Sequence, residues 1–192
     1  MILTNMKTDI YYQPSYASLY SNNGGEVFSF SFKEGSNEMN FLSIKRPINH
    51  VAGKAVDGQY YDLETPYGYG GPVTNCHDGD FLSKAFKAYR AECQTQNIVC
   101  EFIRFHPFNP ITEYKHLFDF HAQERQVVVV DLSLSVEERW AKYSKTTRNI
   151  LRKANKKLNR SCDSQILEGF CSLYEQTMDK NNASDFYYFK RE

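Results

Sequence analysis

The alternation of phenylalanine and serine in residues 26–33 constrains the fold of this 192-residue chain more than any other feature. In this stretch, EVFSFSFK, Phe28, Phe30 and Phe32 share one face of an extended backbone, and the intervening serines share the other. The turn residues NNGG precede it, and residues 39–48, MNFLSIKRPI, have the composition of a hairpin partner. We therefore expect a sheet with one buried face, which helices must cover.

Beyond the hairpin, predicted strands and helices alternate. Residues 60–73 predict a short strand that runs into a rigid loop rich in glycine and proline. Residues 80–96 carry apolar side chains at helical spacing, with Asp78 or Asp80 as the N-cap. Residues 98–105, IVCEFIRF, predict a further strand. This order predicts an α/β (α+β) fold, in which a mixed β-sheet is flanked by helices.

The region after residue 125 predicts one more strand and a long helix. Four consecutive valines within residues 126–132 favour a strand covered on both faces. Ser135 and Glu138 have the spacing of a capping box and begin a predicted helix over residues 136–159. The β-branched pair at 146–147 is expected to divide that helix into two pieces.

The last 32 residues, 161–192, predict one helix and one apolar segment, and the C-terminus looks unfinished. A helix over residues 164–180 is expected to bury its apolar side chains. These are Ile166, Leu167, Phe170, Leu173 and Tyr174. Residues 186–189, FYYF, have the composition of a strand, but no later strand follows to pair with it. Because unpaired apolar edges associate, this predicts self-association of the chain.

Charge is distributed unevenly although its sum is zero, 23 basic against 23 acidic residues. Residues 139–160 contain no acid and nine basic residues: Arg139, Lys142, Lys145, Arg148, Arg152, Lys153, Lys156, Lys157 and Arg160. Like charges three or four apart on a helix repel, so this stripe favours an anionic ligand: a phosphate, a nucleic acid or an anionic lipid surface. The alternative is a solvated helix face.

Composition excludes several classes of protein. With 41% hydrophobic and 24% charged residues, the chain is not disordered as a whole. No apolar run approaches a membrane helix, and the N-terminus lacks a secretion signal, so we expect a cytoplasmic protein. The five cysteines form no C-x-x-C pair, which argues against a disulfide framework and against a zinc site, and we expect no metal.

A glycine-rich loop is the first candidate for a binding site. In TPYGYGGP, residues 65–72, the glycines allow a ligand to approach the backbone closely, and the tyrosines can stack on a flat group. The candidate residues are Tyr67, Gly68, Tyr69, Gly70 and Gly71. The alternative is a tight turn that exposes its tyrosines.

The segment EFIRFHP, residues 101–107, is the second candidate. In an extended strand Arg104 and His106 share one face, so they could meet a ligand together. His106 could then transfer a proton near neutral pH. The alternative is a histidine packed against the turn at Pro107.

Three motifs in this order resemble the FemABX-like branch of the GNAT acyltransferase superfamily. They are YYDLETPYGYGGP at 60–72, EFIRFHPF at 101–108, and W-x7-R-N-I-x2-K-A at 140–154. The resemblance implies two GNAT-like lobes, a first lobe of residues 1–160 that includes the basic helix 136–159, and the incomplete start of a second lobe in residues 161–192. It also implies an acyl donor, either acyl-CoA or aminoacyl-tRNA, with tRNA a partner in the second case. It implies as acceptor an amine on a cell-wall precursor or a nucleotide-linked sugar.

Under this resemblance, Arg148, Arg152 and Lys153 would hold donor or acceptor phosphates. Residues 67–71 would line the acceptor cleft, and His106 would be a candidate proton acceptor. A second hypothesis treats the chain as a non-catalytic module that binds RNA or an anionic surface through residues 139–160. Saturable binding of acyl-CoA would favour the first hypothesis, and steep salt-dependent binding of generic RNA or anionic vesicles would favour the second.

Overall fold

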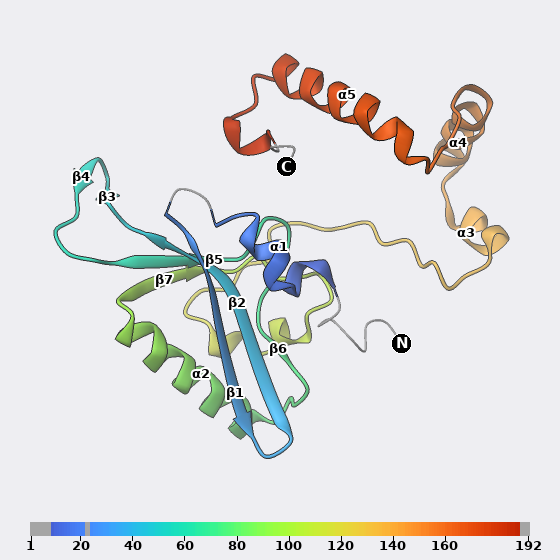
Figure 1. The fold of residues 1–192 in the computed structure, drawn as a ribbon. Coiled ribbons are helices and arrows are strands. Elements are labelled where there is room, and N and C mark those ends of the chain that lie inside the picture. Colours follow the sequence, from blue (N-terminus) through green and yellow to red (C-terminus); the bar gives the residue numbers. More distant parts are fainter. Residues whose placement is uncertain (1–8, 22–23, 189–192) are drawn as a thin grey trace. The chain divides into compact units, whose positions relative to one another are not determined.

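The structure is a computed structural model that describes residues 9–21 and 24–188 (Figure 1). The chain divides into two compact units, residues 1–127 and residues 128–192, which are described separately below. This division falls earlier than the boundary after residue 160 that the sequence suggested. It groups the basic segment with the C-terminal helices.

The N-terminal unit is built on a mixed five-stranded sheet in the order β1-β2-β5-β7, with β6 paired to β2. The strands are β1 (Glu26–Glu34), β2 (Asn37–Pro47), β5 (Tyr61–Glu64), β6 (Val73–Thr74) and β7 (Ile98–Phe102). Strands β1 and β2 form the predicted antiparallel hairpin, in which Phe30 lies opposite Phe41. Strand β5 is antiparallel to β2 and parallel to β7. Strands β3 (His50–Val51) and β4 (Lys54–Ala55) form a separate hairpin.

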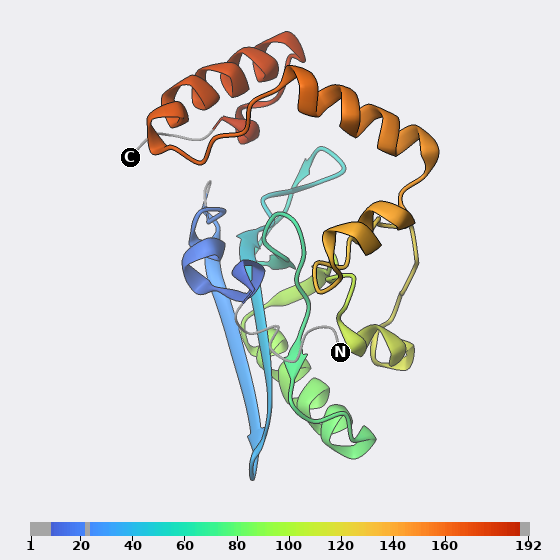
Figure 2. The same cartoon turned by 90° about the vertical axis from the view of Figure 1, so that its right-hand side faces the viewer.

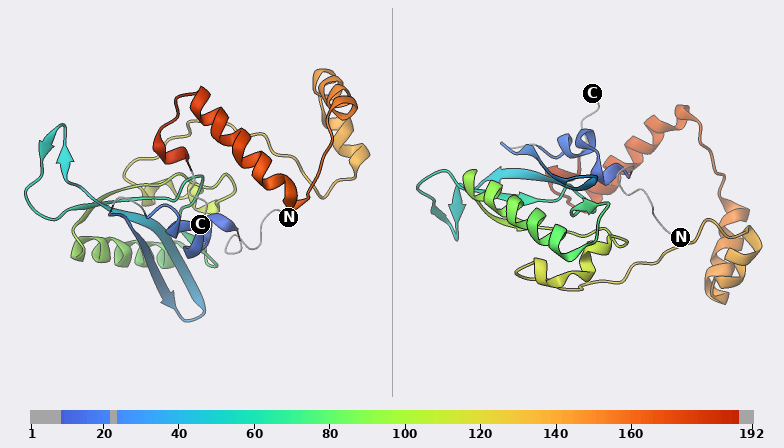
Figure 3. Two further views of the ribbon diagram at one scale, coloured as in Figure 1. Left: turned by 45° about the horizontal axis from the view of Figure 1, so that its top comes forward. Right: turned by 90° about the horizontal axis from the view of Figure 1, so that it is seen from below.

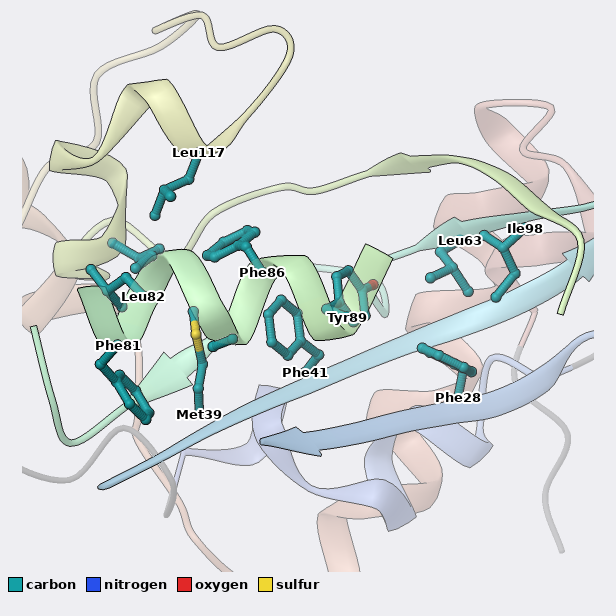
Figure 4. Close-up of a cluster of buried hydrophobic side chains, with 12 residues drawn as sticks. Phe28, Met39, Phe41, Leu63, Phe81, Leu82, Phe86, Tyr89, Ile98 and Leu117 are labelled. Atoms are coloured by element: carbon teal, nitrogen blue, oxygen red, sulfur yellow. The ribbon is translucent and has the colours of Figure 1, made fainter. Parts of the chain in front are cut away.

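Helix α2 (Gly79–Thr95) covers one face of this sheet, as the apolar spacing predicts. Asp78 caps it by accepting hydrogen bonds from the N–H groups of Asp80 and Phe81. Figure 4 shows the resulting core between α2 and the first two strands, where the rings of Phe41 and Tyr89 stack with their centroids 3.9 Å apart. Each large apolar side chain buried here stabilises the fold by about 1.5–3 kcal/mol.

Short helical segments complete the N-terminal unit. Helix α1 (Pro14–Ser18), preceded by the 3-10 turn η2 (Ile10–Tyr12), contacts β1 and β2. It lies on the face opposite α2 (Figures 2 and 3). The 3-10 turns η3 (Pro110–Glu113) and η4 (Lys115–Leu117) follow β7, and Leu117 extends the core beside α2.

The C-terminal unit consists of helices α3 (Val136–Lys142), α4 (Lys145–Lys157) and α5 (Leu167–Lys180), with 3-10 turns η5 (Ser164–Ile166) and η6 (Asp185–Tyr187). The capping box between Ser135 and Glu138 is present as predicted. The long helix is interrupted, but at residues 143–144. There Ser144 caps α4, and its hydroxyl accepts a hydrogen bond from the N–H of Thr147. The side-chain cap sets the break, because it satisfies a free N–H at the start of α4.

Three predictions for this region are wrong. Residues 126–131 form no strand, and Val128 is 96% exposed. The composition alone is not sufficient, because β-branched residues favour a strand only where another strand pairs with them. The apolar face of α5 is exposed among the described residues, including Leu167, Phe170 and Leu173. Residues 185–187 form a 3-10 turn rather than a strand, and Phe189 lies outside the described residues.

One further difference concerns β7, which ends at Phe102 instead of continuing to residue 105. Within the part of the chain that the structure describes, no helix is long and apolar enough to cross a membrane.

Candidate functional site

Three segments of the N-terminal unit that are distant in the sequence meet at one place: residues 9–20, the glycine loop 65–72, and residues 104–109. The Gly70 N–H donates to the carbonyl of Arg104 at 2.8 Å, and the His106 N–H donates to the carbonyl of Gly70 at 3.0 Å. The buried Asn109 amide adds a hydrogen bond to the carbonyl of Pro72 at 3.0 Å. These backbone contacts hold the two sequence-predicted motifs side by side.

His106 is nearly buried, with 8% of its surface exposed. Its Nδ1 accepts a hydrogen bond from the N–H of Phe108 at 3.2 Å, which is the packing against the Pro107 turn that the sequence left as an alternative. Its Nε2 lies 3.6 Å from Oδ2 of Asp9. Burial lowers the pKa of His106, and the negative charge of Asp9 opposes this by raising it.

These contacts assign the proton of a neutral His106 to Nε2, because Nδ1 is already an acceptor. In this tautomer the Nε2 atom can donate a hydrogen bond, but it has no lone pair with which to take a proton from a substrate. The carboxylate of Asp9 is the member of the pair that can accept one. Its other oxygen, Oδ1, accepts from the N–H of Tyr11 at 3.2 Å.

Tyrosine rings surround this pair. The ring of Tyr69 lies 5.6 Å from that of His106, and the rings of Tyr11 and Tyr12 both lie 6.4 Å from it, centroid to centroid. The Tyr12 hydroxyl donates to the carbonyl of Gly70 at 3.1 Å. Burial raises the pKa of Tyr12, so its hydroxyl keeps its proton and acts as a donor.

Sequence reasoning missed Asp9, Tyr11 and Tyr12. The one local signal was that Asp9 is a residue type that caps helices, and it does cap η2. Nothing in the spacing linked Asp9 to a histidine almost a hundred residues later. The sheet and the loop bring them together.

The glycines of the loop are explained by packing within the chain. A Cβ atom at Gly68 would overlap the Tyr11 ring, one at Gly70 would lie 2.8 Å from Cγ2 of Thr65, and one at Gly71 would lie 2.8 Å from Cδ1 of Phe105. Gly68 and Gly71 also have positive φ, +106° and +96°. The close approach that the sequence assigned to a ligand is therefore made by side chains of the protein itself.

The loop nevertheless presents aromatic surface to solvent. Tyr67 is exposed, and its ring stacks on that of Tyr20 with centroids 6.1 Å apart. Its carbonyl accepts a hydrogen bond from the Tyr16 hydroxyl at 2.9 Å. The structure thus combines both interpretations of the loop. The loop is a tight turn, and it exposes the ring of Tyr67 stacked on that of Tyr20, a pair of rings that we call the tyrosine platform.

Arg104 is placed differently from the expectation. Because β7 ends at Phe102, Arg104 and His106 do not share a strand face, and Arg104 is exposed while His106 is buried. The Arg104 N–H donates to Oγ1 of Thr65 at 3.2 Å, and its carbonyl accepts from Gly70. These two contacts anchor the loop through the backbone of Arg104.

The expected phosphate ligands lie on α4, in the C-terminal unit. Arg148 Nη1 reaches the carbonyls of Trp140 and Ala141 at 3.5 and 3.4 Å, and the Arg152 guanidinium lies 5.4 Å from the centre of the Trp140 ring. At about 100° per residue, Arg148 and Lys153 are about 140° apart around the helix. They therefore flank the basic face instead of converging on one point.

Another half-buried acid, Glu101, lies away from this site, beside the core. Glu101 accepts hydrogen bonds from the hydroxyls of Ser43 and Tyr89, each at 2.8 Å. Burial raises the pKa of Glu101, and the two hydrogen bonds oppose that rise. Its donors belong to β2 and α2, so this network joins the sheet to the helix that covers it.

Among residues 9–21 and 24–188, no group of three or more histidine, cysteine, aspartate or glutamate side chains is arranged to hold a metal ion. Comparisons of the chain with models of protein families, with curated proteins and with solved structures find no match. The fold and the site define a mixed α+β protein with an Asp–His pair beside a glycine loop. The resemblance to the FemABX-like branch of the GNAT superfamily stays a prediction.

Proposed function

We propose that this chain is an acyltransferase of the FemABX-like type. It would transfer an acyl or aminoacyl group from acyl-CoA or aminoacyl-tRNA to an amine on a cell-envelope or nucleotide-linked sugar precursor. One observation carries the proposal: the glycine loop and the His106 segment, two of the motifs behind the resemblance, are joined by hydrogen bonds beside the carboxylate of Asp9.

The chemistry needs a proton acceptor near the attacking amine. The amine nitrogen forms a bond to the donor carbonyl carbon, and the C–S bond of a thioester or the C–O bond of an ester breaks, with its electron pair leaving on sulfur or oxygen. The amine proton must go to a base and then to the leaving group. Asp9 is the base in this proposal, and His106 is a positioning residue whose Nε2–H lies 3.6 Å from the Asp9 carboxylate.

The acceptor would lie along the tyrosine platform. The flat apolar face of Tyr67, backed by Tyr20, suits a sugar ring, and tyrosine hydroxyls suit its polar groups. The assignment of the donor phosphates to Arg148, Arg152 and Lys153 is a separate part of the proposal. It does not bear on the roles of Asp9 and His106, which lie in the other unit.

The test measures acyl transfer by the full chain with acetyl-CoA or an aminoacyl-tRNA as donor and a UDP-linked amino sugar as acceptor. Thiol release and deacylated tRNA are the readouts. We expect Asp9→Asn to lower kcat by about 100-fold or more, since general bases contribute about that much. His106→Gln should lower kcat less and shift its pH profile, whereas Asp57→Asn at an exposed position should change nothing.

Two results would overturn the proposal. One is the absence of transfer from both donors. The other is an Asp9→Asn variant as active as the Asp57→Asn control.

A further inference from the structure

Helix α4 has two chemically distinct faces. At about 100° per residue, one side collects basic side chains and the other collects apolar ones. The basic side chains are Lys145, Arg148, Arg152, Lys153 and Lys156, and Lys157 lies at the border next to Ile150. The apolar side chains are Ile150, Leu151, Ala154 and, at the C-cap, Leu158.

Among the described residues, no acidic side chain forms an ion pair with the basic face, and the apolar face is only partly covered, since Leu151 and Ala154 are half-buried. Ile150 is 61% exposed and Leu158 is 71% exposed. No salt bridge among residues 9–21 and 24–188 involves α4. Charge repulsion on one side and exposed apolar area on the other both destabilise the isolated helix. A ligand that neutralises the charges and also covers the apolar side chains therefore binds more tightly than one that does only one of these.

Only one of the three anionic ligands fits both faces. An RNA strand would neutralise the basic side chains but would leave Ile150 and Leu158 in water. A single phosphate would need converging side chains, and Arg148 and Lys153 flank the basic face instead. An anionic lipid surface places phosphate headgroups at the basic face and the acyl-chain boundary at the apolar face.

We propose that α4 binds in the plane of an anionic lipid surface. The helix has 13 residues and rises about 20 Å, which is shorter than the about 30 Å hydrocarbon core, so it lies at the interface rather than crossing it. This binding does not depend on the roles proposed for Asp9 and His106, which lie in the N-terminal unit. On α4 it is an alternative to the binding of donor phosphates by Arg148, Arg152 and Lys153.

The neighbouring helix α3 provides a built-in probe. Trp140, the single tryptophan of the chain, lies under the Arg152 guanidinium, and Arg148 ties the end of α3 to α4. Its fluorescence therefore reports on the helix pair without a label. On binding we expect a blue shift, because tryptophan moves from water toward the headgroup region.

The experiment mixes the full chain with vesicles of phosphatidylcholine alone or with 30% phosphatidylglycerol, and measures co-sedimentation and Trp140 emission. We expect binding to the anionic vesicles only. The combined variant Lys153→Gln/Lys156→Gln should weaken it by about 25-fold, about fivefold per charge, and added salt should weaken it further. Ile150→Asn should weaken it by about tenfold or more, whereas Phe120→Asn, an exposed apolar control in the N-terminal unit, should not.

Several outcomes would overturn the proposal. They are no binding to anionic vesicles, equal binding to neutral ones, or an Ile150→Asn variant that binds as well as the wild type. Tight binding of a generic single-stranded RNA that Ile150→Asn leaves unchanged, without vesicle binding, would assign the helix to nucleic acid. Circular dichroism of each variant in buffer controls for loss of helix, and the wild-type Trp140 shift tests the proposal without any substitution.

Discussion

Replacing Gly68 with alanine separates packing within the chain from a ligand-binding role for the loop. The φ of Gly68 is +106°, and the added Cβ would lie 3.0 Å from both Cδ1 and Cζ of the Tyr11 ring. The backbone strain costs about 1–3 kcal/mol. Moving the ring disturbs edge contacts with Tyr16 and Tyr69, each worth about 0.5–1.5 kcal/mol. We therefore expect Gly68→Ala to lower the free energy of unfolding by about 2–6 kcal/mol.

The matched control is Gly35→Ala in the turn between β1 and β2. Gly35 also has positive φ, +61°, but no heavy atom lies within 4 Å of the position of its Cβ. Gly35→Ala should therefore lower the free energy of unfolding through backbone strain alone, by about 1–2 kcal/mol. Urea unfolding followed by circular dichroism measures both values.

A double-mutant cycle isolates the ring contact. In a Tyr11→Ala background, Gly68→Ala should lose the part of its cost that comes from displacing the ring, and it should approach the control. If Gly68→Ala costs no more than Gly35→Ala, or if its cost is the same with and without the Tyr11 ring, the explanation of the loop by packing is wrong. Gly68 would then face open space, as a ligand-binding loop requires.

Two further predictions concern titration. Because burial raises the folded-state pKa of Glu101, the stability that depends on its protonated form is complete below the ordinary value of 4.5 and is lost as pH rises through the folded pKa. The wild type should therefore lose stability relative to Glu101→Gln over that window in urea titrations, and parallel pH profiles would contradict this. Asp9→Asn removes the charge that raises the pKa of His106, so that pKa should fall further below 6.5 in an NMR titration. An unchanged or higher value would show that the two side chains do not interact.

Local patterns were sufficient for much of the fold. The hairpin, the α2 stripe with its Asp78 cap and the capping box at Ser135 each depend on residues within a few positions of one another. The glycine loop and His106 could be selected as candidates because their residue types are unusual in that spacing. Their partners could not be selected, because Asp9 and Tyr11 are ordinary residues until the backbone bridge brings the segments together.

The sequence by itself determined which segments form strands or helices wherever the pairing partner or cap is a near neighbour, and it determined the two faces of α4. Only the tertiary structure decided whether an apolar run is buried. Residues 127–130 have strand composition, but no strand in the described part of the chain pairs with them. Helix α5 has a regular apolar face that the described residues leave exposed. The tertiary structure also decided that the loop glycines leave space for the side chains of Tyr11, Thr65 and Phe105. The physical reason is that residue spacing sets the direction of a side chain, whereas burial and close approach depend on what lies opposite it, which is a property of the whole chain.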